Sequence, residues 1–385
     1  MTDRIVATEV LKLSEQYPVV TILGPRQSGK TTLCKQLFPD KVYVSLEELD
    51  LRQFATDDPR GFLEKYCQTG VVLDEIQRVP SLLSYVQTEV DLKNKNGQFI
   101  LTGSHQFDLM QSVDQSLAGR TALVKLLPYS VDEIYNKETP SLLKVLYTGF
   151  YPRIFEEQLD PTQAMAFYTA TYVERDLRQL INIKDLTKFE NFLKLCAARV
   201  GQVLNYSSLG SDCGIDQHTV KEWLSILEAS FIIRLLHPYY KNFNKRLVKN
   251  PKLYFIDTGL LCYLLNIKKV DQLDTHPLLG SIFECFIVSE LCKKFSNKVE
   301  NDNLYFFRDH RGREVDVIFD NVVNVDQLEI KLGKTLHGDV FSGLNYLKKS
   351  DLDVSNSYLV YGGEDSRVQG GVDVIPWKSI GGLDL

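Results

Sequence analysis

The stretch GPRQSGKT, from Gly24 to Thr31, decides the fold of the first part of this chain. The apolar run VVTIL at 19–23 precedes it and is rich in β-branched residues, which suits a buried strand. Residues 32–38 follow it with the apolar spacing of a helix. A strand, a loop of the form GxxxxGKT and a helix are the context of a phosphate-binding P-loop. The sequence therefore predicts an α/β domain of the P-loop NTPase type, built on a parallel sheet.

The P-loop predicts a nucleotide site that uses ATP and Mg²⁺. Backbone N–H groups of such a loop point inward and the following helix N-terminus adds positive dipole character, so both attract phosphates. We expect Lys30 to reach the β- and γ-phosphates and Thr31 to ligate Mg²⁺ through its hydroxyl. The expected nucleotide-binding residues are Gly24, Pro25, Arg26, Gln27, Ser28, Gly29, Lys30, Thr31 and Thr32.

The motif VVLDE at 71–75 is typical of a Walker B sequence, in which a buried strand carries acids to the carboxyl edge of the sheet. We expect Asp74 to hold Mg²⁺, directly or through water, and Glu75 to orient or deprotonate the attacking water. The alternative is a strand that ends in a solvated acidic turn, but the preceding P-loop favours the functional interpretation. Both motifs belong to a P-loop domain expected at 1–135.

Further polar residues are candidates for contact with the γ-phosphate. The run QFILTGSH at 98–105 predicts a neighbouring strand, whose polar end offers Thr102 and Ser104 as sensors of the phosphate or the water. A plain Gly-Ser turn is the alternative. Arg120, before a further strand, and Arg175, in a long helix, are candidate arginine fingers, and a finger that acts on a neighbour's nucleotide requires a homo-oligomer. An ion pair along or between helices is the alternative role for Arg175.

Composition indicates an ordinary globular protein with several domains. The chain has 385 residues, of which 44% are hydrophobic and 24% charged. Its apolar runs are too short to cross a bilayer and its N-terminus lacks a signal-peptide pattern, so no membrane partner is expected. Seven dispersed cysteines without a CxxC pair favour reduced thiols in a cytoplasmic protein. With a net charge of −6, nucleic-acid binding requires a local basic patch.

Helical patterns dominate a middle region expected at 136–275. Within it, residues 192–256 are typical of a winged helix-turn-helix, with three helices followed by two strands and with the helix from His218 in the recognition position. Such a wing can contact DNA phosphates, and the alternatives are a lid, a protein interface or a solvated hairpin. The wing at 241–252 lacks acidic residues and holds Lys241, Lys245, Arg246, Lys249 and Lys252.

A C-terminal α/β domain is expected at 276–385. Asp316 and the pair Glu329 and Lys331 lie in expected strands, and Glu284 lies in a preceding helix. Alternate residues of a strand share a face, so Glu329 and Lys331 point together. The acids Glu284, Asp316 and Glu329 can share a divalent metal, while Lys331 positions or activates the water that attacks a phosphodiester. The alternative is an inactive nuclease fold that is kept for interaction.

Together these motifs resemble a prokaryotic family of AAA-type ATPases that carry a C-terminal DUF4143 region. The resemblance covers nearly the whole chain. It implies ATP binding and a C-terminal domain similar to PD-(D/E)xK, or restriction-endonuclease-like, nucleases, but no particular process. The segments that carry it are GPRQSGKTTL at 24–33, VVLDEIQRVP at 71–80, ILTGS at 100–104, LAGRT at 117–121, YVERD at 172–176 and REVD…EIK within 313–331.

Two functions follow from this organisation. In the first, a Mg²⁺-dependent AAA+-type ATPase couples its nucleotide state to a nuclease-like domain that acts on DNA. In the second, the chain is a nucleotide-controlled switch or scaffold, whose winged helix and inactive nuclease-like domain bind a protein partner. Salt-dependent DNA binding separates the two, because phosphate contacts release counterions.

Overall fold

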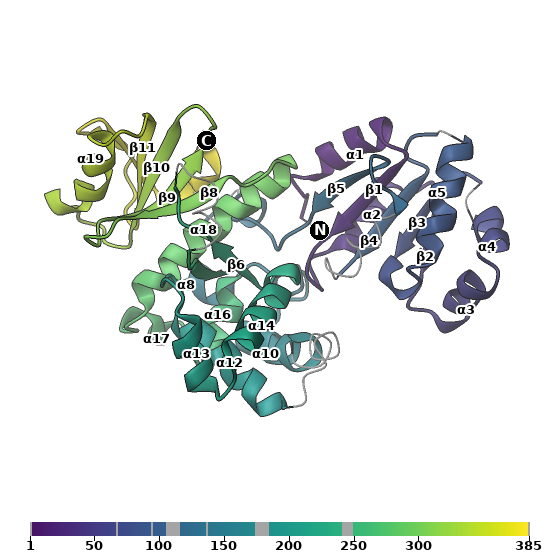
Figure 1. Ribbon diagram of the computed structural model, residues 1–385, viewed down its shortest axis with the longest axis horizontal. Coiled ribbons are helices and arrows are strands. Elements are labelled where there is room, and N and C mark those ends of the chain that lie inside the picture. Colours follow the sequence, from purple (N-terminus) through teal and green to yellow (C-terminus); the bar gives the residue numbers. More distant parts are fainter. Residues whose placement is uncertain are drawn as a thin grey trace. The chain divides into compact units, whose positions relative to one another are not determined.

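The chain divides into two compact units, each described here by itself (Figure 1). The first unit holds Met1–Tyr129 with residues 229–231 and 295–300, and the second holds the rest. The computed structural model describes residues 2–383 except Cys67, Asn94, 105–115, 136–137, 174–184 and 241–248.

The first unit is built on a sheet of five parallel strands in the order β2-β3-β4-β1-β5. Every residue of β1, β3 and β4 is buried. Near-continuous burial is expected of central parallel strands, because helices cover both faces of such a sheet. The predicted parallel sheet of a P-loop fold is thereby confirmed. The strands are β1 (Val19–Leu23), β2 (Val42–Ser45), β3 (Val71–Asp74), β4 (Phe99–Gly103) and β5 (Thr121–Lys125).

Helices alternate with these strands along the chain. Val10 of α1 and Leu33 of α2 pack with the sheet residues Val20 and Ile22 in one buried apolar cluster. Burying each such side chain contributes about 1.5–3 kcal/mol relative to leaving it in water. This packing fixes the helix that follows the P-loop against the strand that precedes it. The helices are α1 (Ala7–Gln16), α2 (Lys30–Leu37), α3 (Leu49–Asp57), α4 (Pro59–Tyr66), the 3₁₀ turn η1 (Ile76–Arg78) and α5 (Leu82–Lys93).

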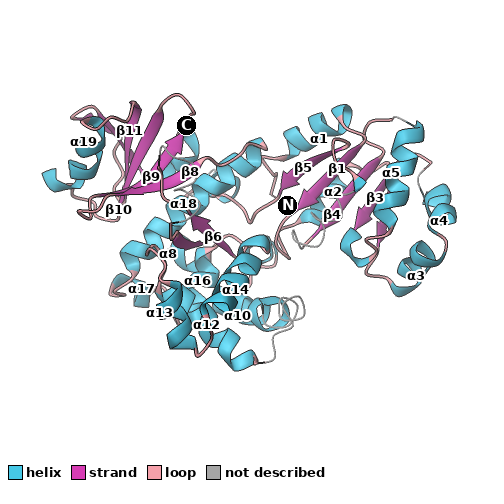
Figure 2. Ribbon diagram, in the orientation of Figure 1, coloured by secondary structure: helices cyan, strands magenta, loops and turns pink. Residues whose placement is uncertain are grey.

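The second unit begins with a part that is mainly helical (Figure 2). An antiparallel pair of strands, β6 (Ile233–Leu236) and β7 (Lys252–Phe255), interrupts the helices. The other elements are α7 (Val131–Ile134), α8 (Leu142–Thr148), α9 (Pro152–Glu156), α10 (Pro161–Tyr168), the π turn η2 (Thr169–Val173), α12 (Leu186–Ala198), α13 (Tyr206–Cys213), α14 (Gln217–Ala229), α16 (Thr258–Leu264) and α17 (Asp271–Asp274).

The order α12, α13, α14, β6, β7 is the order that a winged helix requires. Asp185 and Asn205 accept hydrogen bonds from the backbone N–H groups three residues on, and these caps define where α12 and α13 begin. Trp223 of α14 packs edge-to-face on Phe189 and Phe192 of α12, with ring centroids 5.2 and 5.1 Å apart. Most of the predicted basic wing, residues 241–248, lies outside the described residues, so the winged helix stays a prediction.

The second unit continues with a mixed six-stranded sheet in the order β12-β13-β11-β10-β9-β8. Strands β10, β11 and β13 pair in parallel, and the remaining pairings are antiparallel. This mixed sheet and its helices confirm the predicted α/β class for the C-terminal part. Its elements are α18 (Leu279–Lys298), β8 (Leu304–Arg308), β9 (Glu314–Asp320), β10 (Val325–Lys331), η3 (Gly338–Phe341), α19 (Ser342–Lys348), β11 (Val354–Tyr361), β12 (Arg367–Gln369), β13 (Val372–Pro376) and η4 (Trp377–Gly382).

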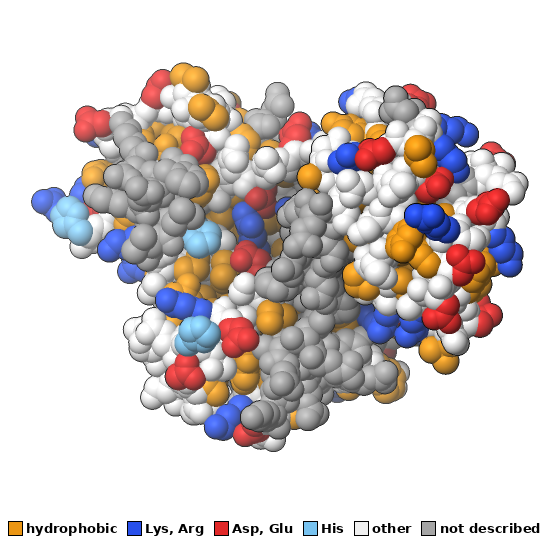
Figure 3. Space-filling view, turned by 45° about the vertical axis from the view of Figure 1, so that its right-hand side comes forward, with side chains coloured by type: hydrophobic (Ala, Val, Ile, Leu, Met, Phe, Trp, Pro, Cys, Tyr) orange, Lys and Arg blue, Asp and Glu red, His pale blue; other side chains and the backbone are white. Residues whose placement is uncertain are grey.

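Acidic and basic side chains are interspersed on the face of the molecule drawn in Figure 3. Among the helices that the structure describes, none is both long enough and apolar enough to cross a membrane.

Candidate nucleotide site and acidic cluster

The loop between β1 and α2 has a backbone that favours glycine at Gly24 and Gly29. A Cβ atom on Gly24 would lie 2.1 Å from the carbonyl oxygen of Leu126, so a side chain there would clash with the backbone. Gly29 has a φ of 90° and Gln27 a φ of 62°, both in the left-handed region. Glycine adopts this region without steric cost. The loop therefore wraps tightly at the end of β1, and α2 begins at Lys30.

The ammonium group of Lys30 lies inside this loop. Its Nζ atom donates hydrogen bonds of 2.9 Å to the carbonyl oxygens of Gly24 and of Pro25. Burial lowers the pKa of Lys30, and the nearby carboxylates of Glu75 and Asp74 oppose that shift. The side chain thus presents its charge where the loop amides would hold a phosphate.

Asp74 connects three elements at the end of β3. Its Oδ2 atom accepts a 2.8 Å hydrogen bond from the hydroxyl of Thr31 and a second one from Tyr43 of β2. Its Oδ1 atom accepts from the hydroxyl of Thr102 on β4. Carboxylate and hydroxyl oxygens are ligands that Mg²⁺ prefers, so Asp74 and Thr31 form a donor set that suits this ion.

Glu75 follows β3 with a φ of 58°, a left-handed conformation that is uncommon outside glycine. Its Oε2 atom accepts a 3.1 Å hydrogen bond from Ser104 and another from the side-chain amide of Gln77. That amide also donates to the Ser104 hydroxyl at 3.2 Å. The backbone N–H of Glu75 donates to the Thr102 hydroxyl at 3.2 Å. The structure thus brings Asp74, Glu75, Thr102 and Ser104 into one hydrogen-bonded group.

A second group of charged residues lies in the C-terminal part, around Lys252 of β7. Lys252 is 2% exposed, and its Nζ atom lies 2.9 Å from Glu284, 2.5 Å from Glu314 and 3.7 Å from Asp316. Burial alone lowers the pKa of Lys252, but Glu284, Asp316 and Glu314 outweigh burial, and the pKa is raised. The prediction that Lys252 contacts DNA from an exposed wing is therefore wrong. Its ammonium group instead forms ion pairs with acidic side chains inside the protein.

Glu329 and Lys331 of β10 lie next to this group and pair with each other at 2.6 Å. Asp316 accepts a 2.8 Å hydrogen bond from the backbone N–H of Ile330, which ties it to the same strand. The Oε2 atom of Glu329 is buried and has no hydrogen-bond partner among the described residues. Burial, and then the charge of Asp316, raise the pKa of Glu329 to about 8.

These residues do not fit the predicted nuclease metal. Among the described residues, no three His, Cys, Asp or Glu side chains are grouped so that they could hold a metal ion. The Oε1 atom of Glu284 already accepts from Lys252 and, at 2.5 Å, from the Tyr254 hydroxyl. The predicted ligands Glu284, Asp316 and Glu329 are thus arranged around two ammonium groups rather than around a divalent cation.

Three family matches cover most of the chain. Residues 16–135 match the AAA domain, residues 139–271 match a domain of unknown function, DUF8612, and residues 279–380 match DUF4143. The chain is an AAA-type P-loop protein with a C-terminal DUF4143 domain.

Relatives and solved structures are similar over long stretches. Uncharacterized proteins of Mycobacterium tuberculosis and Mycobacterium bovis are each 29% identical over 366 residues, covering 93% of this chain and 79% of theirs. A Walker-type ATPase of Pyrococcus abyssi is 15% identical with a TM-score of 0.47, covering 69% of this chain and 96% of that one. AMPPCP-bound DnaA of Aquifex aeolicus is 15% identical with a TM-score of 0.31, covering 58% of this chain and 86% of that one.

The structure does not bring Arg120 to the P-loop of its own AAA domain. Thr121 pairs with Val19, so Arg120 lies at the amino ends of the strands, whereas the P-loop follows their carboxyl ends. Its guanidinium pairs with Asp91 of α5 at 2.6 and 2.9 Å. Arg120 is therefore excluded as a finger for its own nucleotide, and its side chain is half-buried. The second candidate, Arg175, lies outside the described residues.

Sequence reasoning missed several residues that position the AAA site. Gln77 holds Glu75, and Tyr43 contacts Asp74 from the adjacent strand. Arg4 donates to the backbone carbonyl of Ser28, in the P-loop, at 3.3 Å and to that of Leu127 at 2.6 Å. Of these three residues, only Gln77 could have been suspected from the sequence, because it lies two residues after Glu75. Of the remaining predicted loop residues, Arg26 is half-buried and Thr32 is exposed on the first turn of α2.

Proposed function

We propose that this AAA-type protein binds ATP with Mg²⁺ and hydrolyses it. The observation that carries the proposal is the hydrogen-bonded group at the carboxyl edge of the sheet, where Thr31 contacts Asp74 and where Ser104 contacts Glu75. In open α/β sheets this edge is where ligands bind. The two acids therefore lie beside a loop that is shaped to hold phosphates.

Each residue has a role that its position supports. Lys30 neutralises charge on the β- and γ-phosphates, and the backbone N–H groups from Gly24 to Thr32 hold the phosphate oxygens. Bound Mg²⁺, held by Thr31 and Asp74, would supply charge stabilisation of the transferring phosphoryl group. Glu75 accepts a proton from the attacking water or orients it, and Ser104 positions that carboxylate.

Replacement of Lys30 by alanine tests this proposal. We expect Lys30→Ala to reduce ATP affinity or turnover by orders of magnitude, because a charge-assisted contact to the phosphates is lost. Lys35→Ala, an exposed change on the same helix, is the matched control and should leave both unchanged. Unchanged ATP affinity and turnover in a folded Lys30→Ala protein would refute the proposal.

For the C-terminal domain, the arrangement around Lys252 favours the second predicted function, a nucleotide-controlled scaffold, over the nuclease. A surface feature of this domain supports a protein partner. At the tip of the hairpin between β9 and β10, Val322 and Val323 are 88% and 82% exposed. Val322 has a φ of 73°, which is strained for a β-branched residue. Exposed apolar side chains in a strained turn are costly and suit a docking contact.

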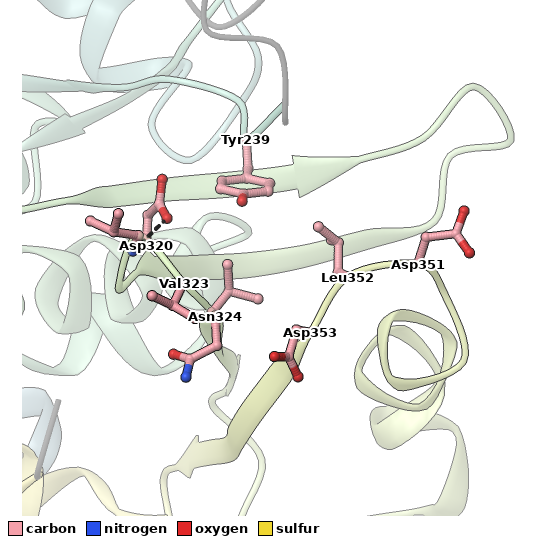
Figure 4. A pocket seen from close by; sticks show the side chains of 9 residues that line it. Tyr239, Asp320, Val323, Asn324, Asp351, Leu352 and Asp353 are labelled. Carbon is pink, nitrogen blue, oxygen red and sulfur yellow. Dashed lines mark hydrogen bonds between the residues drawn. The ribbon is translucent and has the colours of Figure 1, made fainter.

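Beside this tip lies a cavity of ≈ 380 Å³ with an acidic lining (Figure 4). Tyr239 and Leu352 supply apolar surface, and the carboxylates come from Asp320, Asp351 and Asp353. The described lining holds three carboxylates and no Lys or Arg, so the complementary partner is a protein segment in which Lys or Arg alternates with apolar residues.

A peptide probe tests this surface. We expect a Leu-Lys-Leu-Lys peptide to bind saturably and a Leu-Glu-Leu-Glu peptide not to bind. Val323→Asp should abolish binding, and Val368→Asp, at another valine that is 73% exposed, should preserve it. Equal binding of both peptides, or binding that survives Val323→Asp, would remove the partner assignment. The cysteines that the structure describes are buried and form no disulfide with one another, which accords with the proposed cytoplasmic setting.

A further inference from the structure

Lys252 is the centre of a charge cluster that joins three elements of the second unit. It comes from β7, Glu284 from α18, and Glu314 and Asp316 from β9. Each of the three carboxylates lies within 4 Å of its one buried nitrogen. The sequence motif of the DUF4143 region requires two of these acids for a metal, but no part of that motif includes Lys252.

We infer that the ammonium group of Lys252 is the resident cation of the DUF4143 acidic cluster, in place of a divalent metal, and that it binds β7 to α18 and β9. In this role the cluster is an internal ionic joint between the region matched by DUF8612 and the DUF4143 domain.

The charges of the cluster are nearly balanced without a metal. Glu284, Glu314 and Asp316 surround Lys252, and Arg308 lies 3.7 Å from the second oxygen of Glu314. The fourth acid, Glu329, has its own partner in Lys331 at 2.6 Å. Four acidic side chains thus face three cationic side chains. A buried group of acids that lacked such partners would repel one another and be costly to ionise.

An added divalent cation would compete with Lys252 for the same oxygens. Mg²⁺ binds carboxylate oxygens at about 2.1 Å. The oxygen of Glu284 that faces the cluster lies only 2.9 Å from the Lys252 nitrogen, so an ion bound to it would approach a positive charge in a buried site. Like charges at such separations repel strongly where water is excluded. The lysine and the metal therefore exclude each other.

Further contacts hold β7 at this cluster. Residues 252 and 254 lie on the same face of this strand, and the hydroxyl of Tyr254 donates to the same Glu284 oxygen at 2.5 Å. Lys252 further lies 5.6 Å from the centre of the Phe306 ring of β8. This cation–π contact and the ion pairs together hold the Lys252 side chain in one position.

Manganese binding tests the inference without reference to catalysis. The full chain is used with Asp74→Asn throughout, so that the nucleotide site does not bind Mn²⁺, and bound Mn²⁺ is measured by electron paramagnetic resonance. We expect no Mn²⁺ at the cluster when Lys252 is present. Lys252→Met leaves the acids without their cation and lets their side chains regroup, so it should create one site that Asp316→Asn removes. Lys249→Met, at an exposed lysine three residues earlier, should create none.

Two results would each overturn the inference. The first is Mn²⁺ bound to the protein with Lys252 intact and lost on Asp316→Asn, a comparison that decides the question even if Lys252→Met does not fold. The second is a folded Lys252→Met protein that binds no Mn²⁺, because the acids that Lys252 contacts would then need no cation. Lys252→Arg provides a further check: it retains a cation and should fold without binding Mn²⁺.

Discussion

The hydroxyl of Thr31 donates a 2.8 Å hydrogen bond to the Oδ2 atom of Asp74. This contact joins the first turn of α2 to the end of β3, although the two residues are 43 positions apart. It unites the loop that is shaped for phosphates with the acid that ends β3, a buried strand that β4 separates from β1. The proposed ATP site depends on this junction.

Glu75→Gln should retain ATP and hydrolyse it slowly. The amide cannot accept the proton of the attacking water, while Asp74 and Thr31 are unchanged, so we expect turnover to fall by about 10²–10⁴-fold. Single-turnover hydrolysis and a nucleotide-binding titration measure the two effects separately. Hydrolysis at the wild-type rate would assign the base to another residue, and loss of ATP binding would make Glu75 structural.

Thr102→Val should slow hydrolysis while the protein stays folded. The change keeps the shape of the side chain but removes a hydroxyl that contacts both Asp74 and the backbone N–H of Glu75. Leaving such buried groups without a partner costs about 1–3 kcal/mol. Where this cost applies in the transition state, turnover falls by about 5- to 150-fold. The matched control is Thr121→Val, since the Thr121 hydroxyl contacts Thr21 and the backbone carbonyl of Ala122 in the same sheet and neither of the two acids. Equal effects of the two changes would contradict a role for Thr102.

An arginine finger in trans predicts an oligomer. If Arg120 completes a neighbour's site, ATPase activity per chain should rise with protein concentration. Mixing Lys30→Ala chains with Arg120→Ala chains should then restore part of the activity. Asp91→Asn controls for the loss of the Arg120 ion pair alone. Activity that is independent of concentration down to a demonstrated monomer would exclude the finger, and activity without recovery on mixing would transfer the role to Arg175.

The titration of Glu329 should lower the free energy of unfolding as the pH rises from about 4.5 to 8. The pKa of this carboxyl is about 8 in the folded chain against an ordinary value of 4.5. The folded state therefore keeps a proton that the unfolded chain releases, so this contribution is complete below pH 4.5 and is lost as the pH approaches 8. The contribution of Glu329 to the free energy of unfolding changes by at most about 1.4 kcal/mol per pH unit.

Urea denaturation across this range measures the effect. Glu329→Gln should unfold with a shallower pH dependence than the wild type, because the amide does not titrate. Glu300→Gln, at an exposed position, should follow the wild-type curve. Identical pH profiles for the wild type and Glu329→Gln would show that Glu329 is ionised in the fold.

Much of the nucleotide site could be predicted because its contacts follow from local rules. The spacing of Gly24 and Gly29 permits one tight loop, and α2 begins at Lys30, within the motif. Parallel strands end at one edge, so acids after β3 and hydroxyls after β4 had to lie near that loop. The contacts of Glu75 with Ser104 and of Asp74 with Thr102 agree with that expectation.

The sequence by itself therefore determined the P-loop domain, the parallel sheet and the α/β class of the C-terminal part. Only the tertiary structure decided what the charged residues outside the P-loop do. Lys252 reads as one of a series of exposed basic residues, yet folding buries it against acids that are 32 to 64 positions away. Arg120 is directed to Asp91 by the pairing of β1 with β5. Ion pairs across long sequence separations leave no periodicity in the sequence, because each partner is selected by packing and by the cost of burying an unpaired charge.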